Sequence, residues 1–261
     1  MRSSDDIRFD GTARLYSDAG LARLRNAHVC VIGIGGVGSW SVEALARSGI
    51  GQFTLIDLDE VCISNVNRQV HALGNTVGQA KVEVMAARVH GINPEAVVHP
   101  CLAFFTETNA DELLAPDFSY VIDAIDRSTK KALMIARCHA KGVPIITIGA
   151  AGGRTDATAL RVMDLADATH DRLLQGVRAR LRRDFSFPKG GKRLGIDCIS
   201  STERPAYPAK GESCAGEAGE HLGCDSAYGS ACHVTGAFGL AAAGYVIQKL
   251  ANTNPNSRTA G

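Results

Sequence analysis

Four glycines lie close together in the stretch VIGIGGVGSW, residues 31–40, with the spacing of a phosphate-binding turn. An apolar run over 28–32 precedes them, and a small-residue helical pattern follows from Val37 to about Arg47. A glycine loop between a strand and a helix presents backbone N–H groups to phosphate at the helix N-terminus. We therefore predict a nucleotide site at Gly33, Gly35, Gly36 and Gly38. The glycines alone do not distinguish a redox cofactor from a nucleotide that is consumed.

The charged residues that follow favour a nucleoside triphosphate. Asp57 ends the strand predicted within QFTLIDLD (52–59), where a ribose-binding carboxylate belongs in either case. Arg68 and Lys81 come next, in SNVNRQVHALGNTVGQAK (64–81). A hydride-transfer cofactor needs little extra positive charge. A triphosphate carries about four negative charges, which must be neutralised before its α-phosphorus accepts an anionic nucleophile.

Two carboxylates in YVIDAID (120–126) stand where a later strand ends. Asp123 and Asp126 are expected to face the same crevice, and a carboxylate there suits Mg²⁺ that bridges phosphates. Each charged residue also has an ordinary alternative: Arg68 or Lys81 as a surface cation, and either aspartate as a cap for the helix that starts near Ser128. The order of all these residues together is more specific than any one of them.

Strands that alternate with helices place these residues on an α/β fold with a Rossmann-like, doubly wound and mostly parallel sheet. Residues 1–261 are interpreted as one domain, with a nucleotide-binding half over about 8–150 and a substrate-side half over about 151–250. The second half is expected to add an antiparallel C-terminal part. It contains the strand-like ALRVMDLA (159–166) and a helical, strongly basic segment over 169–184. A long stretch rich in Gly, Pro, Ser and Lys, residues 186–223, is expected to be a mobile basic loop.

Composition limits the remaining classes. The formal net charge is +1, so affinity for nucleic acid or membrane must be local. None of the eight cysteines forms a Cys-x-x-Cys pair, which argues against structural zinc. The N-terminus lacks an apolar core of signal-peptide length, and the apolar stretch 234–247 is shorter than the roughly 20 residues of a membrane span. We expect a cytoplasmic protein with a buried helix at 234–247 and no membrane association.

The joint order of motifs resembles the ubiquitin-activating-enzyme-like superfamily of ThiF, MoeB and HesA, which includes adenylyltransferases that activate sulfur-carrier proteins. Within it, the chain resembles the bacterial branch that dehydrates threonylcarbamoyladenosine in tRNA. The matching segments cover nearly the whole chain. They are RFDGTARLY (8–16), GIGGVGSWSVEALARSGIG, VCISNVNRQVHALG, SYVIDAID, GAAGG, LGIDCISSTE and TGAFG.

This resemblance implies specific roles. The glycines would cradle the phosphates of ATP, and Asp57 would bind the ribose hydroxyls. Asn65, Arg68 and Lys81 would hold the triphosphate, and Asp126 would contact Mg²⁺ or the α-phosphate region. Arg14 would reach into the ATP site of a second copy, which implies a homodimer. The catalytic set is thus Arg14, Arg68, Lys81 and Asp126.

The implied reaction is ATP-dependent cyclisation of threonylcarbamoyladenosine through an acyl adenylate, with loss of one water. Two alternatives stay open at this point. An adenylyltransferase for a sulfur-carrier or ubiquitin-like protein would bind a Gly-Gly C-terminus, and many such enzymes carry the zinc pairs that are missing here. A nicotinamide-dependent oxidoreductase would bind NAD but leaves Arg68 and Lys81 unexplained.

A local cluster of basic residues lies between Thr169 and Arg193 and predicts contact with the tRNA backbone. Its alternative is a solvated helix face. Phe185 and Phe187 could stack on an unpaired base or anchor the loop to the core. The resemblance also allows a sulfur-mobilising partner, and a covalent role for Cys224, although intramolecular closure needs no thioester. The predicted tRNA contacts are Arg178, Arg180, Arg182, Arg183, Lys189, Lys192 and Arg193.

Overall fold

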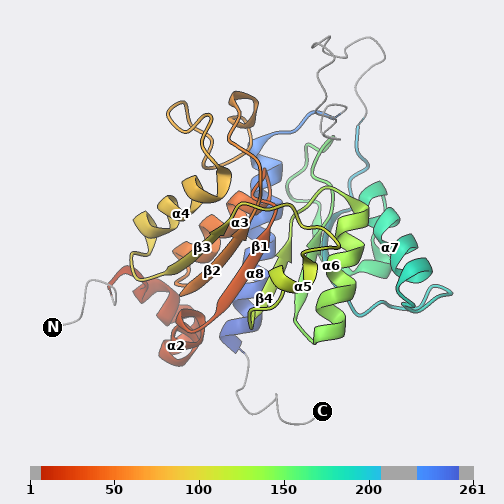
Figure 1. The fold of residues 1–261 in the computed structure, drawn as a ribbon, viewed down its shortest axis with the longest axis horizontal. Helices are drawn as coiled ribbons and strands as arrows, with labels where there is room; N and C mark the ends of the chain where they lie inside the picture. Colours follow the sequence, from red (N-terminus) through yellow and green to blue (C-terminus); the bar gives the residue numbers. More distant parts are fainter. Residues whose placement is uncertain (1–6, 207–227, 253–261) are drawn as a thin grey trace.

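A seven-stranded sheet forms the centre of the protein, in the order β3-β2-β1-β4-β5-β7-β6. The computed structural model describes residues 7–206 and 228–252 (Figure 1). Every neighbouring pair is parallel except β6 and β7, which are antiparallel. The α/β class and the added antiparallel part are therefore confirmed. The strands are β1 (His28–Ile32), β2 (Gln52–Ile56), β3 (Val97–Cys101), β4 (Tyr120–Asp123), β5 (Ile145–Ile148), β6 (Leu160–Asp164) and β7 (Asp197–Ser201).

Helices cover both faces of this sheet, as the doubly wound prediction requires (Figure 1). One apolar core joins α2, α3, α4 and α8 to the sheet, and a second core joins α5, α6 and α7 to its other face. Two short 3-10 turns, η1 (Ile63–Asn65) and η2 (Leu165–Asp167), complete the connections. The helices are α2 (Asp10–Arg25), α3 (Gly38–Arg47), α4 (Lys81–Ile92), α5 (Ala110–Leu113), α6 (Ser128–Lys141), α7 (Arg172–Asp184) and α8 (Cys232–Asn252).

The apolar helix predicted over 234–247 is the middle of α8. By length and composition alone α8 is the one helix in the described ranges that could cross a membrane. Here its Val234, Phe238 and Ala242 are fully buried in the first core, and the helix packs on α2 and α3. Its content of glycine and alanine permits this close packing.

The stretch 186–223 is not a loop throughout, which corrects the sequence-based expectation. Residues 197–201 form β7, a buried strand between β5 and β6. Two of its five residues are the buried serines Ser200 and Ser201, so the strand lacks the apolar run that marks β1 or β4. Phe187 is buried beside the ring of His139, so it anchors the chain to the core rather than offering its face to a base. Residues 207–223 lie outside the described part of the chain.

Candidate functional site

The glycine loop is too tightly packed for side chains at two of its positions. Gly33 has a positive φ of 92°, and a Cβ built on it would lie 2.9 Å from the carbonyl of Ala124. A Cβ on Gly38 would lie 1.8 Å from the carbonyl oxygen of Gly33. The loop thus passes directly over the end of β4 and enters α3 at Gly38. Its N–H groups lie at the N-terminus of α3, where phosphate binds most readily.

Asp57 is fixed beside this loop. Its Oδ2 accepts a hydrogen bond from the N–H of Ile34 at 2.6 Å, and its Oδ1 accepts one from the N–H of Asp59 at 2.9 Å. Burial raises the pKa of the Asp57 carboxyl, and the charge of Lys81 and the two N–H donors oppose that rise. The carboxylate that the sequence assigns to ribose therefore stands next to the predicted phosphate cradle.

Lys81 reaches the same edge from the first residue of α4. Its Nζ lies 2.8 Å from Oδ2 of Asp59, and its side chain is only 8% exposed. Its backbone N–H also donates to the carbonyl of Asp59 at 3.0 Å. Because Asp59 is itself 55% exposed, the pair is open to solvent on the carboxylate side. A triphosphate that entered here would compete with Asp59 for the ammonium group.

Arg68 lies against the glycine loop. A Cβ built on Gly36 would be 3.5 Å from Cγ of Arg68, so the stem of the arginine follows the loop. Nη1 of Arg68 donates to the carbonyl of Ser64 at 2.7 Å and to Oδ1 of Asn67 at 3.1 Å. Asn65 is buried, and its Oδ1 accepts from the N–H of Cys62 at 3.0 Å, which shapes the turn η1.

Asp123 and Asp126 occupy different environments although they are three residues apart. Asp126 is exposed on the loop between β4 and α6, where it can meet a metal ion or phosphate. Asp123 is fully buried, and the structure does not bring it to the surface of the crevice. Its Oδ1 lies 3.1 Å from Nζ of Lys131, and its Oδ2 accepts from the hydroxyl of Thr147 at 2.6 Å.

Sequence reasoning missed Lys131. The signal was present, because Lys131 falls on the same face of α6 as the buried Met134, Ile135 and Cys138. A charged residue on the apolar face of a helix requires a buried partner. Nζ of Lys131 also donates to the carbonyl of Asp123 at 3.1 Å and to Oγ1 of Thr147 at 3.2 Å, and so it links β4, β5 and α6.

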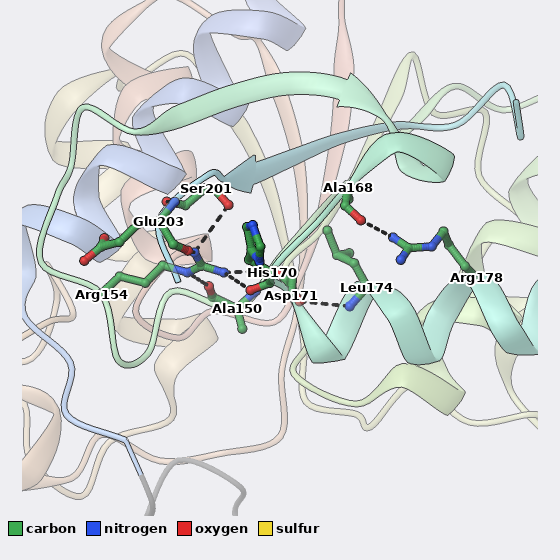
Figure 2. A network of polar contacts seen from close by, with 9 residues as sticks. All are labelled: Ala150, Arg154, Ala168, His170, Asp171, Leu174, Arg178, Ser201 and Glu203. Atoms are coloured by element: carbon green, nitrogen blue, oxygen red, sulfur yellow. Dashed lines mark hydrogen bonds and ion pairs between the residues drawn. The ribbon is translucent and has the colours of Figure 1, made fainter. Parts of the chain in front are cut away.

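Arg154 is a second residue that sequence reasoning missed, and it is the centre of the network in Figure 2. Its guanidinium is almost fully buried and donates to four carbonyl oxygens, two of which lie 47 and 49 residues further along the chain. The side chain of Asp171 lies 3.7 Å away and caps α7 by accepting from the N–H of Leu174 at 2.9 Å. The network therefore fixes the start of α7 at the carboxyl ends of β5 and β7. The accepting carbonyls belong to Ala150, His170, Ser201 and Glu203.

The predicted tRNA contacts separate into two groups. Arg178 is half-buried and donates to the carbonyl of Ala168 at 2.7 Å (Figure 2). It also donates to the carbonyl of Leu165 at 3.1 Å, so it stabilises η2. Four other arginines are also engaged locally. Lys189 and Lys192 are exposed. The local partners are Ser128 for Arg180, the carbonyls of Pro188 and Lys192 for Arg182, Asp184 for Arg183 and Asp164 for Arg193.

Arg14 lies far from the glycine loop within one chain. Its side chain is 82% exposed on α2, 3.8 Å from Asp10. Helix α2 lies at the amino ends of the strands, opposite the glycine loop. A Cβ on Gly49, just after α3, would contact Phe9, and the N–H of Gly51, just before β2, donates to the carbonyl of Leu24. A role for Arg14 at the nucleotide would thus require a second chain.

Among the cysteines within residues 7–206 and 228–252, three are buried, and Cys62 and Cys232 are exposed. Burial raises the pKa of the Cys30, Cys138 and Cys198 thiols, which are packed in the core. No group of three or more metal-ligating side chains is found in that part of the chain. Cys224 lies outside the described residues. Asp126 could still hold Mg²⁺, since that ion is usually bound by one or two carboxylates together with substrate phosphates and water.

Several known proteins are similar to this chain over half of its length or more. The family model described as ThiF family matches residues 10–260. The tRNA threonylcarbamoyladenosine dehydratase of Escherichia coli is 47% identical over 93% of each chain. A crystal structure of the E. coli tRNA N6-threonylcarbamoyladenosine dehydratase in complex with ATP superposes with a TM-score of 0.85, at 44% identity, over 94% of each chain. The molybdopterin-synthase adenylyltransferase of Salmonella typhimurium is 37% identical over 51% of this chain and 53% of its own length.

Proposed function

Because the chain belongs to the ThiF family, we propose that it uses ATP to dehydrate threonylcarbamoyladenosine in tRNA. The observation that carries this proposal is the set of groups at one edge of the sheet. The glycine loop supplies N–H donors, Asp57 supplies a carboxylate for ribose, and two cations stand nearby: Arg68 against the loop and Lys81 beside Asp59. The two cations favour a triphosphate over NAD. The E. coli crystal structure, which covers 94% of this chain and 94% of its own, contains ATP.

The chemistry follows from the poor leaving ability of a carboxylate oxygen. In the first step the threonyl carboxylate attacks the α-phosphorus of ATP, and the bond to pyrophosphate breaks. In the second step the ureido group of the same side chain attacks the activated acyl carbon, loses a proton and expels AMP. One carboxylate oxygen leaves on AMP, so the nucleoside loses the elements of one water.

The residues of this chain act mainly by charge and position. Arg68 and Lys81 would neutralise the phosphates and the charge that develops on the leaving pyrophosphate. Lys81 would exchange its bond to Asp59 for one to phosphate. Mg²⁺, held by the exposed Asp126, would supply further neutralisation between the phosphate groups. The second nucleophile is part of the substrate, so the enzyme needs only to hold it near the acyl carbon.

Several features of the assembly belong to the same proposal. We place the protein in the cytoplasm, as a homodimer in which Arg14 of one chain reaches the ATP site of the other. The tRNA backbone would meet Lys189 and Lys192 together with the exposed sides of α6 and α7. A sulfur-mobilising partner remains a prediction from the resemblance alone.

The test uses the full chain with ATP, Mg²⁺ and tRNA that carries threonylcarbamoyladenosine. Digestion to nucleosides and mass spectrometry would report the loss of one water, and AMP and pyrophosphate would be counted in parallel. We expect one AMP for each nucleoside converted. Pyrophosphate exchange without that product would redirect the proposal to a carrier protein with a Gly-Gly C-terminus. Absence of ATP turnover together with NAD binding would overturn it.

A further inference from the structure

We infer that Trp40 and Thr235 are positioning residues for Arg68, and that through it they favour binding of ATP over AMP. The inference rests on the proposed ATP-dependent function. It assigns a role in that function to two residues that lie outside the nucleotide-binding set described above. Both come from helices that flank the glycine loop, α3 and α8.

The first observation is that two side chains donate to one carbonyl oxygen. Nε1 of Trp40 donates to the carbonyl oxygen of Arg68 at 3.0 Å. Oγ1 of Thr235 lies 3.2 Å from the same oxygen, which is nearer than the carbonyl oxygens of Cys232 and Ala231 at 3.3 and 3.4 Å, so its single hydrogen is assigned to Arg68. Thr235 is buried. Two donors from different helices fix this peptide group from two sides. The Cα atom from which the guanidinium stem departs is thereby fixed as well.

The second observation is that the site depends on an unusually close approach of α8 to α3. A Cβ built on Gly239 would lie 2.4 Å from the carbonyl oxygen of Val37 and 2.7 Å from Cβ of Trp40. One on Gly236 would lie 3.7 Å from the indole ring. Because α8 approaches so closely, the hydroxyl of Thr235 reaches the loop that carries Arg68. This explains the sequence TGAFG, which the nucleotide chemistry left unexplained.

The third observation is that the same contacts extend to the phosphate cradle. A Cβ built on Gly36 would lie 3.3 Å from Cγ2 of Thr235 and 3.5 Å from Cγ of Arg68. The methyl group of Thr235 and the stem of Arg68 therefore lie side by side against the loop. Asn67 adds a further link to the start of α8, because its Nδ2 donates to the carbonyl of Ser230 at 2.8 Å.

Loss of these contacts to Arg68 should weaken the binding of ATP more than that of AMP. A cation that is already held in place loses little conformational freedom when phosphate binds. ATP carries about four negative charges and AMP about two, so misplacement of Arg68 weakens the binding of ATP more than that of AMP. A residue with a purely structural role would reduce the affinity for both nucleotides or for neither.

The experiment compares the dissociation constants of ATP and AMP by calorimetry, with Mg²⁺ present, for the full chain and for Thr235→Val. This substitution removes the hydroxyl and retains the volume. We expect the dissociation constant for ATP to rise about three- to tenfold, the size of one lost hydrogen bond, and that for AMP to change less than about twofold. Thr235→Ser, which keeps the donor, should bind ATP like the wild type. Equal weakening of both nucleotides, or no change in either, would overturn the inference.

Ser41→Ala is the matched control. The hydroxyl of Ser41 also joins α3 to α8, through the carbonyl of Gly239 at 3.1 Å, but it does not contact Arg68. Its loss should leave the ratio of the two dissociation constants unchanged. If Ser41→Ala shifts that ratio as Thr235→Val does, the effect comes from helix packing and the inference is wrong.

Trp40→Phe is the second test variant and covers the case in which Thr235→Val does not fold. It removes the N–H donor but keeps an aromatic ring in the pocket, and it should also weaken ATP selectively. The proposed function fails separately: a wild-type protein that binds no ATP and forms no AMP would refute it. A wild-type protein that forms AMP, with unchanged ATP affinity in both variants, would refute only the positioning role.

Discussion

At the scale of single residues, the buried pair of Lys131 and Asp123 determines how the end of β4 is held. Both side chains are fully buried, and the hydroxyl of Thr147 completes the set of hydrogen bonds. Charges at this depth are stable only when each is paired and hydrogen-bonded. Asp123 lies three residues before the exposed Asp126 in the chain, and Lys131 lies five residues after it. We therefore interpret it as the anchor of the β4–α6 loop and not as a phosphate ligand.

Removal of one member should be costly. Lys131→Met leaves the carboxylate of Asp123 buried without its cation, and we expect the free energy of unfolding to fall by about 3–5 kcal/mol. Lys130→Met, at the neighbouring position outside this pair, should change it by less than about 0.5 kcal/mol. Urea denaturation at neutral pH measures both. Equal stability of the two variants would contradict the interpretation.

The burial of His71 should make the free energy of unfolding depend on pH. The ring is buried, and within the described part of the chain its two nitrogens have no hydrogen-bond partner. Burial, with help from the charges of Lys81 and Arg88, lowers the pKa of His71 from 6.5 to about 4. Between these values the unfolded chain takes up a proton that the folded protein does not. Stability therefore falls as the pH drops through this window.

The size of the effect follows from the shift. Between pH 7.5 and 4.5 we expect His71 to account for about 2–3 kcal/mol of lost stability. His71→Leu removes the titrating group. It breaks no side-chain hydrogen bond, because the ring nitrogens have no partner within the described residues. Urea denaturation at the two pH values would show a smaller loss for the variant than for the wild type. Parallel pH profiles would show that His71 does not titrate as proposed.

At the scale of elements, α7 is the part in which charge and structure are most easily confused. Its arginines first suggest a nucleic-acid surface, yet Arg178 is bonded to two carbonyls of the η2 region. Arg178→Ala should lower the free energy of unfolding by about 2 kcal/mol.

Lys189→Glu combined with Lys192→Glu should leave the free energy of unfolding within about 0.5 kcal/mol of the wild type but weaken tRNA binding about tenfold or more.

The salt dependence of tRNA binding separates the two effects. Reversal of both exposed lysines should reduce the slope of log affinity against log salt by about 1–2, because their phosphate contacts are lost. Arg178→Ala should leave this slope unchanged. An unchanged slope in the double lysine variant would move the tRNA surface away from this loop.

What the sequence could predict depends on how far apart the interacting residues are. The glycine loop and Asp57 belong to one strand–loop–helix unit and the strand that follows it. Their spacing in the sequence was therefore sufficient to predict that they lie side by side. The bonds of Arg154 to Ser201 and Glu203 span 47 and 49 residues, and no local pattern records them. Strand β7 was missed for a related reason. Its serines are buried by neighbouring strands and helices, and nothing adjacent in the sequence indicates that burial.

At the scale of the whole molecule, the carboxyl and amino ends of the strands carry different groups. The proposed nucleotide-binding groups lie at the carboxyl ends of β1, β2 and β4, and α2 with Arg14 lies at the amino ends of the strands. Within one chain the arginine is remote from the phosphates that the family resemblance assigns to it. The proposed site is complete only if a second chain supplies Arg14. We therefore expect activity to depend on the proposed dimer.

Mixing of two inactive variants tests this arrangement. Arg14→Ala and Arg68→Ala should each abolish AMP formation as homodimers. In a mixed dimer one site combines the intact Arg68 of one chain with the intact Arg14 of the other, and the second site lacks both. Random pairing of equal amounts places half of all chains in mixed dimers, so activity should recover to about a quarter of the wild-type value. If Arg14 acted within its own chain, each site would lack one arginine and no activity would return. Different affinity tags on the two variants would allow the dimer that carries both tags to be isolated, so that an absence of activity in it counts against the shared site.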